Sequence, residues 1–384
     1  MKIRFLLVLI VLMTLAIGLA VWLLRGPRPA PKPAPKTPGT GQALTPVTPL
    51  PPPELTMATF KLTTVPASLP ANLQAQTGQC TAGILIDLTA KEILWAKSPD
   101  LPVPIASMTK MMTALLLMEA IHTEHRVDMQ TRVQVTAEAA NIGGSQVWLD
   151  PRENFTIEDL TKCLMIKSAN DAAYLLGEFL GNGNAAFVAQ MNGRARELGC
   201  PGMTFYNSHG LPPNAKSPEN QATPRELALL GARLLEYPDL MQICSVKTDQ
   251  LRQNTPKPTM LFNHNTMISR RPCLGVDGLK TGLTAKSGHC ITASCLRNGR
   301  RMIAVVTGCP KADVRDRLTA ALLDWGYARQ VGKPVPPLPT APAATPAARA
   351  SAEAAGGTTS AATPPPARSP HPRARDPGNA KARS

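Results

Sequence analysis

Aromatic residues are scarce in this 384-residue chain, and acidic residues are far fewer than basic ones. Phe, Trp and Tyr make up 4% of the residues, and 26 acidic residues face 41 Lys and Arg, for a formal net charge of +15. Residues 1–53 carry six basic and no acidic residues, and residues 331–384 carry seven basic and two acidic. The centre therefore keeps only +4. A basic nucleic-acid module would concentrate its charge on the folded part and interleave it with aromatics, so we expect no nucleic-acid partner.

Metal-binding and redox spacings are also missing. No Cys-x-x-Cys pair occurs and the six histidines are scattered, so we expect no metal site and no cofactor. Eight cysteines lie between positions 80 and 309, an even number that suits an oxidising compartment, although their pairing cannot be deduced. The alternative is that several are small, buried apolar residues.

One long apolar run occurs near the start of the chain. Residues 5–24 carry no charge and are preceded by Lys2 and Arg4 and followed by Arg25, a length that can cross a bilayer as a helix. The run ends without a convincing small-x-small cleavage site, so we favour a membrane anchor at residues 1–25 over a cleaved signal segment.

Two further segments have compositions that do not build a core. Residues 26–57 are expected to be a Pro-rich linker, which favours extended polyproline conformation. Residues 331–384 are basic, rich in Pro and Ala and free of aromatics, and we expect this tail to be disordered. Residues 58–330 remain as one globular domain, large enough for a substantial core.

Within this domain the residue patterns predict strands at both ends and helices between them. The strands are expected at 82–88, 91–96, 276–284, 289–297 and 301–308, and the helices at 110–121, 157–165, 171–180, from 224 and at 314–325. Thr156 and Thr223 are expected to cap two of these helices, and Asn298-Gly299 suits a hairpin turn. The pattern predicts an α+β domain with one mostly antiparallel sheet packed against helices.

The first of three polar signals is Ser107-Met108-Thr109-Lys110, at the start of an apolar helix. Three residues separate Ser107 from Lys110, so both lie on one helical face. Apolar neighbours remove water from Lys110, which lowers its pKa and favours its action as a base on a Ser107 nucleophile. The alternative is a capping serine followed by a lysine that extends to solvent.

The second and third signals are Ser168-Ala169-Asn170, between two helices, and Lys280-Thr281-Gly282, on a strand. The helix junction can direct a hydroxyl and an amide into a cleft, and the alternative is a helix N-cap. On the strand, Gly282 leaves room for another backbone, and Lys280 and Thr281 can hold a carboxylate. An exposed strand lysine is the alternative for Lys280.

Together and in this order, the three signals resemble those of serine-type D-alanyl-D-alanine carboxypeptidases, the low-molecular-mass penicillin-binding proteins. The resemblance covers about residues 79–327, and its supporting stretches are 105–112, 168–173, 207–211, 275–284 and 322–327. It implies the fold shared by penicillin-binding proteins and serine β-lactamases, with residues 58–330 as the catalytic domain. It also implies release of the terminal D-Ala from peptidoglycan stem pentapeptides through an acyl-enzyme, and acylation by β-lactams.

The resemblance also implies roles for individual residues. Ser107 is the nucleophile, Lys110 takes its proton, Ser168 relays a proton to the leaving amine, and Asn170 orients Lys110 and the substrate. The resemblance also implies an oxyanion hole formed by the N–H groups of Ser107 and Leu283. It implies a site for the substrate carboxylate formed by Lys280, Thr281 and Gly282. Arg315, which aligns with a family arginine before the last helix, would assist this carboxylate site.

Three other functions remain open at this stage. A β-lactamase shares the signals, although we find no Glu-x-x-x-Asn loop between Asp171 and Glu226. A D-Ala-diaminopimelate endopeptidase would use the same residues, and a non-enzymatic cell-wall binding module is the third alternative. Because peptidoglycan lies outside the cytoplasmic membrane, a single-pass anchor at residues 1–25 would place the catalytic domain on the extracytoplasmic, periplasmic side.

Overall fold

A six-stranded sheet organises the structure, a computed structural model that describes residues 54–65, 68–253 and 255–332. Across the sheet the strands are β1 (Thr63–Thr64), β3 (Glu92–Lys97), β2 (Ala82–Asp87), β12 (Arg300–Cys309), β11 (Gly288–Arg297) and β10 (Val276–Thr284). Only β1 pairs in parallel, with β3, and all other neighbours are antiparallel. The predicted α+β class with a mostly antiparallel sheet is confirmed, and β10 forms one edge of the sheet.

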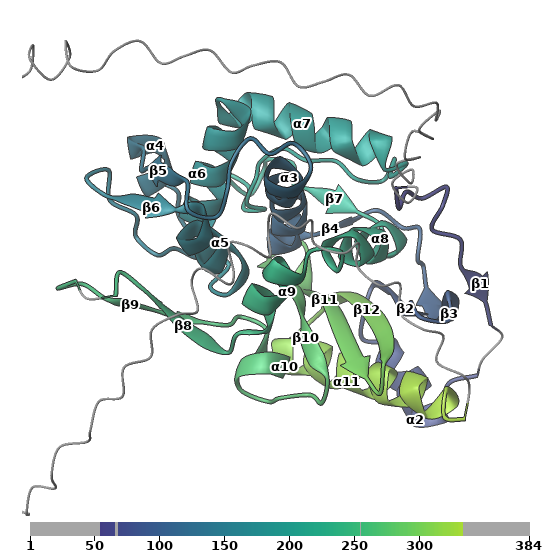
Figure 1. Ribbon diagram of the computed structural model, residues 1–384. Helices are drawn as coiled ribbons and strands as arrows, with labels where there is room; N and C mark the ends of the chain where they lie inside the picture. Colours follow the sequence, from purple (N-terminus) through teal and green to yellow (C-terminus); the bar gives the residue numbers. More distant parts are fainter. Residues whose placement is uncertain (1–53, 66–67, 254, 333–384) are drawn as a thin grey trace, which may run out of the picture. The chain divides into compact units, whose positions relative to one another are not determined.

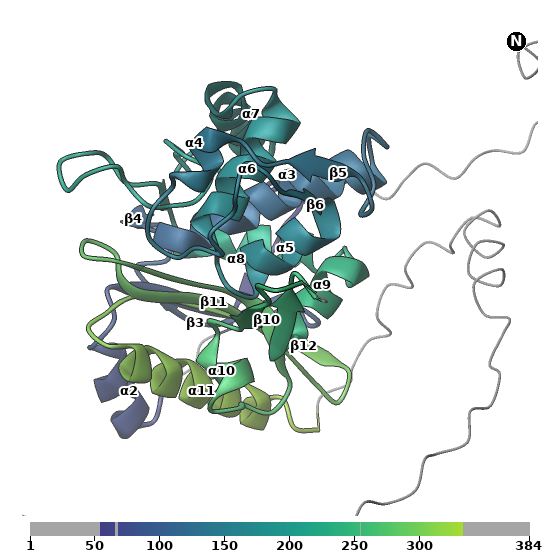
Figure 2. The same cartoon turned by 90° about the vertical axis from the view of Figure 1, so that its left-hand side faces the viewer.

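Helices cover both faces of this sheet (Figures 1 and 2). One face packs against α11 (Ala312–Arg329), which also contacts α2 (Ala71–Thr77), and the other packs against α8 (Pro224–Leu234). Successive strand residues point to opposite faces. On β2, for example, Ile84 and Ile86 belong to the core under the helical region, whereas Leu85 belongs to the core under α11.

The helical region lies between the N-terminal and C-terminal strands of the sheet in sequence. Its elements are α3 (Lys110–His122), α4 (Ala137–Ala140), α5 (Ile157–Met165), α6 (Asn170–Gly181), α7 (Asn184–Glu197), α8 and α9 (Pro238–Ser245). Helix α3 is buried along most of its length and contacts α5, α6, α7 and α8, so it forms the centre of this region (Figure 1). Both predicted caps are present as capping boxes, from Thr156 to Asp159 and from Thr223 to Glu226.

Several elements were not predicted, most of them short. They are the strand pairs β4 (Val103–Pro104) with β7 (Gln221–Ala222), β5 (Arg132–Gln134) with β6 (Asn154–Thr156), and β8 (Thr248–Leu251) with β9 (Thr259–Phe262), and the helices α2, α4, α7, α9 and α10 (Thr266–Ser269). The predicted closing helix begins at Ala312 rather than Val314, and it extends to Arg329.

The ends of the chain are only partly covered. The predicted anchor at 1–25, linker residues 26–53 and tail residues 333–384 lie outside the described residues, and no helix among those described is long and apolar enough to cross a membrane. Glu54, in the segment predicted as linker, pairs with Arg194 and lies 3.4 Å from Arg233. All eight cysteines are described and unpaired, and all except Cys273 are buried, which confirms the alternative of small buried residues.

Candidate active site

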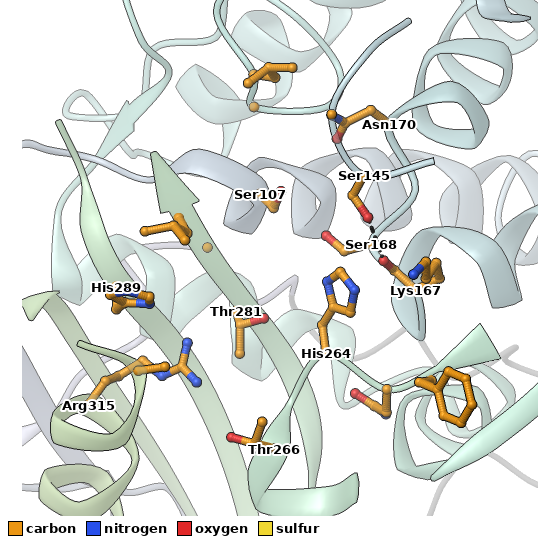
Figure 3. A pocket seen from close by; sticks show the side chains of 18 of the residues that line it. Ser107, Ser145, Lys167, Ser168, Asn170, His264, Thr266, Thr281, His289 and Arg315 are labelled. Atoms are coloured by element: carbon orange, nitrogen blue, oxygen red, sulfur yellow. Dashed lines mark hydrogen bonds between the residues drawn. The ribbon is translucent and has the colours of Figure 1, made fainter. Parts of the chain in front are cut away.

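The three polar signals come together at one cavity of about 510 Å³ (Figure 3). The cavity lies where the 3₁₀ turn η1 (Ala106–Thr109), the start of α6 and the edge strand β10 meet. Of the predicted site residues, those that line it are Ser107, Ser168, Asn170, Thr281, Gly282, Leu283 and Arg315. Lys110 and Lys280 are not among the lining residues, because their side chains are buried behind the cavity surface, with 0% and 1% exposed.

Ser107 lies on η1, directly before α3. The preceding Ala106 has φ 45°, a left-handed conformation that a residue with a side chain adopts at a cost, and η1 has no side-chain cap. Gly210 packs against this turn, since a Cβ there would lie 1.9 Å from the Ala106 carbonyl oxygen. The capping-serine alternative for Ser107 is therefore wrong. Its hydroxyl is instead directed into the cavity (Figure 3).

Lys110 holds the position of a base beside this hydroxyl. Its Nζ donates to Ser107 Oγ at 3.1 Å, to Asn170 Oδ1 at 2.7 Å and to the His209 carbonyl oxygen at 2.6 Å. Burial lowers the pKa of Lys110 well below its ordinary 10.5, the positive charge of Lys280 lowers it further, and Asp171 opposes the shift. The alternative of a lysine that extends to solvent is wrong, because this amine is fully buried.

The Ser168-Ala169-Asn170 segment forms the opposite wall. Ser168 has φ 60°, and the N-cap of α6 is Ala169, which makes no side-chain cap, so the capping alternative for Ser168 and Asn170 is wrong. The amide of Asn170 is held on both sides, since its Oδ1 accepts from Lys110 and its Nδ2 donates to the Gly143 carbonyl oxygen at 2.8 Å. This arrangement fixes the amine of Lys110 and leaves the Ser168 side chain facing the cavity.

The Lys280-Thr281-Gly282 strand closes the third side. A Cβ at Gly282 would lie 2.6 Å from the Ile105 carbonyl oxygen and 3.3 Å from the Ser107 nitrogen, so glycine permits the close approach of β10 to η1. This places the backbone of Gly282 beside that of Ser107. Thr281 faces the cavity and is 8% exposed.

Lys280 is not the exposed strand lysine of the alternative prediction. Its Nζ donates to the neighbouring Thr281 carbonyl oxygen at 3.3 Å, and burial lowers its pKa to about 7, with Arg315 contributing in the same direction. Arg315 lies in the first turn of α11, not before the last helix as expected. It pairs with Asp316 at 2.6 Å while lining the cavity.

Several parts of the site were not predicted from the sequence. The His209 carbonyl and Gly210 help to hold Lys110 and η1, and their stretch was noted only for its family resemblance. Lys167, His264 and Arg270 also line the cavity and had not been selected. Of these three residues, only Lys167 could have been selected from the sequence, because it directly precedes the motif residue Ser168.

The arrangement has the components of nucleophilic catalysis. A serine hydroxyl, an amine whose lowered pKa favours the neutral form, and an amide that orients that amine lie in hydrogen-bonding contact. The neutral amine offers a lone pair to the proton of Ser107. Ser107 and Leu283, whose N–H groups the family resemblance assigns to an oxyanion hole, both line this cavity.

Comparisons with known proteins agree with this geometry. The family model described as D-alanyl-D-alanine carboxypeptidase matches residues 70–311. The chain is 33% identical over 257 residues to D-alanyl-D-alanine carboxypeptidase DacF of Bacillus subtilis, covering 67% of this chain and 64% of the relative. It is 30% identical over 265 residues to DacC of Escherichia coli, covering 66% and 63%. The chain thus spans less than two thirds of the length of these relatives.

Solved structures carry the same fold. Penicillin-binding protein 6B from Escherichia coli superposes with a TM-score of 0.59 at 28% identity, covering 68% of this chain and 79% of that chain. Penicillin-Binding Protein D2 from Listeria monocytogenes, in its ampicillin-bound form, superposes with a TM-score of 0.57 at 27% identity, covering 65% and 98%. The predicted penicillin-binding-protein fold is confirmed. Since the family model also matches most of the described residues, the chain belongs to the D-alanyl-D-alanine carboxypeptidase family.

Proposed function

We propose that this chain is a serine-type D-Ala-D-Ala carboxypeptidase. It removes the terminal D-Ala from peptidoglycan stem pentapeptides, and β-lactams acylate the same serine. The observation that carries the proposal is the buried amine of Lys110, 3.1 Å from Ser107 Oγ at the cavity surface. Membership of the family and the likeness to a penicillin-binding protein in an ampicillin-bound form support it.

The acylation step follows from the contacts of Ser107. Its Oγ bonds to the carbonyl carbon of the penultimate D-Ala while Lys110 accepts the hydroxyl proton. The N–H groups of Ser107 and Leu283 stabilise the negative oxygen, and loss of one such donor typically costs about 3 kcal/mol. Ser168 passes a proton to the leaving nitrogen, the C–N bond breaks, and D-Ala departs. Water then cleaves the ester and returns a proton to Ser107.

Substrate binding uses the other side of the cavity. Thr281 and Arg315 line it and are placed to hold the terminal carboxylate, with the charge of Lys280 behind them. Strand β10 is an edge strand of the sheet, so an extended peptide can pair with it as an added strand. The carboxylate contacts select a free C-terminus, and the edge strand selects an extended peptide.

The nucleophile is tested by Ser107→Ala. The variant should lose both D-Ala release and covalent labelling by penicillin while its circular dichroism spectrum stays unchanged, because no other hydroxyl contacts Lys110 among the described residues. Ser145→Ala is the matched control, since Ser145 lines the same cavity but donates to the Lys167 carbonyl oxygen, and it should still be labelled. Retained labelling in folded Ser107→Ala would overturn the assignment.

An endopeptidase is the second candidate function. The chain is 26% identical over 226 residues to the D-alanyl-D-alanine endopeptidase of Escherichia coli, covering 59% of this chain and 70% of that relative. Digestion of a monomeric pentapeptide and of a cross-linked dimer separates the two activities, and we expect faster cleavage of the pentapeptide. Failure to take up labelled penicillin would favour a non-enzymatic cell-wall module instead.

We also propose that the enzyme is a single-pass protein of the cytoplasmic membrane with its catalytic domain outside. The support is the uncharged run at residues 5–24 and the position of peptidoglycan outside the membrane. The Pro-rich residues after the anchor would give the domain reach towards the cell wall.

A further inference from the structure

The cavity is lined by basic side chains and, among the described residues, by no acidic one. Lys167, Arg270 and Arg315 all face it, whereas no Asp or Glu belongs to its lining. Because these basic side chains line the same cavity as Ser107 and Asn170, their positive charge acts directly on a ligand bound there. A cavity lined by cations and by no acidic side chain favours a substrate with more than one negative group.

The three cations are not equivalent. Arg315 is already engaged, since it pairs with Asp316 and donates to the Cys290 carbonyl oxygen at 3.4 Å. By contrast, neither the amine of Lys167 nor the guanidinium of Arg270 has a hydrogen-bond or ion-pair partner within the described part of the chain. These two side chains are free to bind a ligand.

The backbone at Lys167 is also held in a fixed place. Its carbonyl oxygen accepts from Ser145 Oγ at 3.0 Å, and the carbonyl oxygen of the preceding Ile166 accepts from the His264 nitrogen at 2.9 Å. Figure 3 shows Lys167 and Arg315 on opposite sides of the cavity, with Thr281 and His264 between them. The terminal-carboxylate side and the Lys167 side are therefore separate regions of one site.

The pKa of His264 is affected by the same positive charges. Removal from bulk water lowers the pKa of His264, and the charges of Lys280, Lys167, Lys110 and Arg270 each lower it further. No acidic group contributes in the opposite direction among these causes. His264 therefore stays neutral and leaves the cationic character of this side to Lys167 and Arg270.

We propose that Lys167 and Arg270 form a second anion site, which binds a free carboxylate of the stem peptide on the acyl side of the scissile bond. This inference rests on the proposed carboxypeptidase function and names the substrate that the site prefers. The penultimate D-Ala has only a methyl side chain, and its carboxyl group is the scissile carbonyl. The second carboxylate must therefore come from an earlier residue.

Two stem-peptide groups have this chemistry. A diamino diacid at the third position, such as diaminopimelate, carries a free side-chain carboxylate, and lysine is the same residue without it. A γ-linked D-glutamate at the second position carries a free α-carboxylate, which amidation neutralises. Three pentapeptides distinguish these sources: one with both carboxylates, one with lysine at position three, and one with the D-glutamate amidated.

The experiment measures D-Ala release by the full chain and, in parallel, equilibrium binding of the same peptides to Ser107→Ala. We expect the lysine peptide to show a KM about fivefold higher and an unchanged kcat, because a charge contact made equally in ground and transition states affects KM alone. Lys167→Gln and Arg270→Gln should each remove most of this difference. Arg271→Gln is the matched control, since Arg271 is the neighbouring arginine, exposed and outside the cavity lining, and should keep it.

The outcomes separate the two proposals. Equal KM and equal affinity for all three peptides would overturn the second anion site while leaving the carboxypeptidase intact. A preference sensitive only to D-glutamate amidation would keep the site and assign it to that carboxylate. If no peptide loses D-Ala, the proposed function fails, and binding to Ser107→Ala still decides whether Lys167 and Arg270 discriminate the carboxylates.

Discussion

Two buried lysines at the site have very different surroundings. Lys110 donates to three oxygen acceptors, including Asn170 Oδ1 and the His209 carbonyl. Among the residues that the structure describes, the amine of Lys280 donates only to the Thr281 carbonyl oxygen, at a long 3.3 Å. Burial of an amine with so few partners opposes folding, so Lys280 lowers the stability of the folded chain.

The pKa of Lys280 leads to a prediction about stability. Burial lowers it to about 7 from an ordinary 10.5. Between these values the unfolded chain binds one proton more than the folded chain, so the free energy of unfolding rises with pH, by about 1.4 kcal/mol per pH unit from this group. We expect Lys280→Met to be more stable than the unchanged protein near pH 7 and to gain less stability as pH rises to about 10.

Urea denaturation at several pH values across this window checks the prediction. Lys286→Met is the matched control, because Lys286 is close in sequence but exposed, and its pH dependence should follow that of the unchanged protein. A Lys280→Met variant that is less stable throughout the window would show that the lysine contributes more through its contacts than its burial costs.

At the scale of elements, the geometry of the nucleophile depends on two glycines, one outside the three catalytic motifs and one within the third. Gly210 has φ 88° and lies against the Ala106 carbonyl, and Gly282 approaches the Ile105 carbonyl and the Ser107 nitrogen. These contacts join η1 to β10 and to the loop that contains His209. The position of Ser107 is therefore set by three segments far apart in the sequence.

Gly210→Ala should displace η1 and slow acylation by penicillin on the order of a hundredfold, because small misplacements of reacting groups have effects of that size. The added Cβ would lie 1.9 Å from the Ala106 carbonyl oxygen, so the backbone has to move. Gly193→Ala in α7 is the control, with its nearest contact at 3.8 Å and an expected small gain in stability. Unchanged acylation in folded Gly210→Ala would show that η1 does not position Ser107.

The sequence predicted the elements whose ends carry local chemical marks. Thr223 with Pro224 and Glu226 marks the start of α8, and the Asn298-Gly299 turn marks the β11–β12 hairpin. The β8–β9 pair carries no such mark, because its four-residue strands are half exposed and lack regular alternation. Short pairs of this kind depend on tertiary packing rather than on local preference.

The site was predictable to a similar extent. The motif residues have defined spacing, so their grouping could be inferred, and the structure brings them to one cavity. His264 and Arg270, which line that cavity, flank α10, a four-residue helix that the sequence does not mark. The burial of Lys280 also depends on neighbours that the strand pattern alone does not define.

At the scale of the whole molecule, the described residues begin on a charged cluster. Glu54 contacts Arg194 and Arg233, and both arginines also bind the buried carboxylate of Glu119. A network of several charges holds geometry better than an isolated surface pair. The chain is therefore attached to the catalytic domain from Glu54 onward, and accessible cleavage sites are expected before it.

The proposed topology gives the last prediction. Protease added to spheroplasts should cut within residues 26–53 and release a soluble domain that binds penicillin and begins near Glu54, because the charged cluster protects the chain from that residue onward. The anchor at residues 1–25 should stay with the membrane. Mass measurement of the released fragment and penicillin labelling check both statements. A domain that is cut only after the membrane is lysed would contradict the orientation, and a mature protein that lacks residues 1–24 would show that the segment is a cleaved signal.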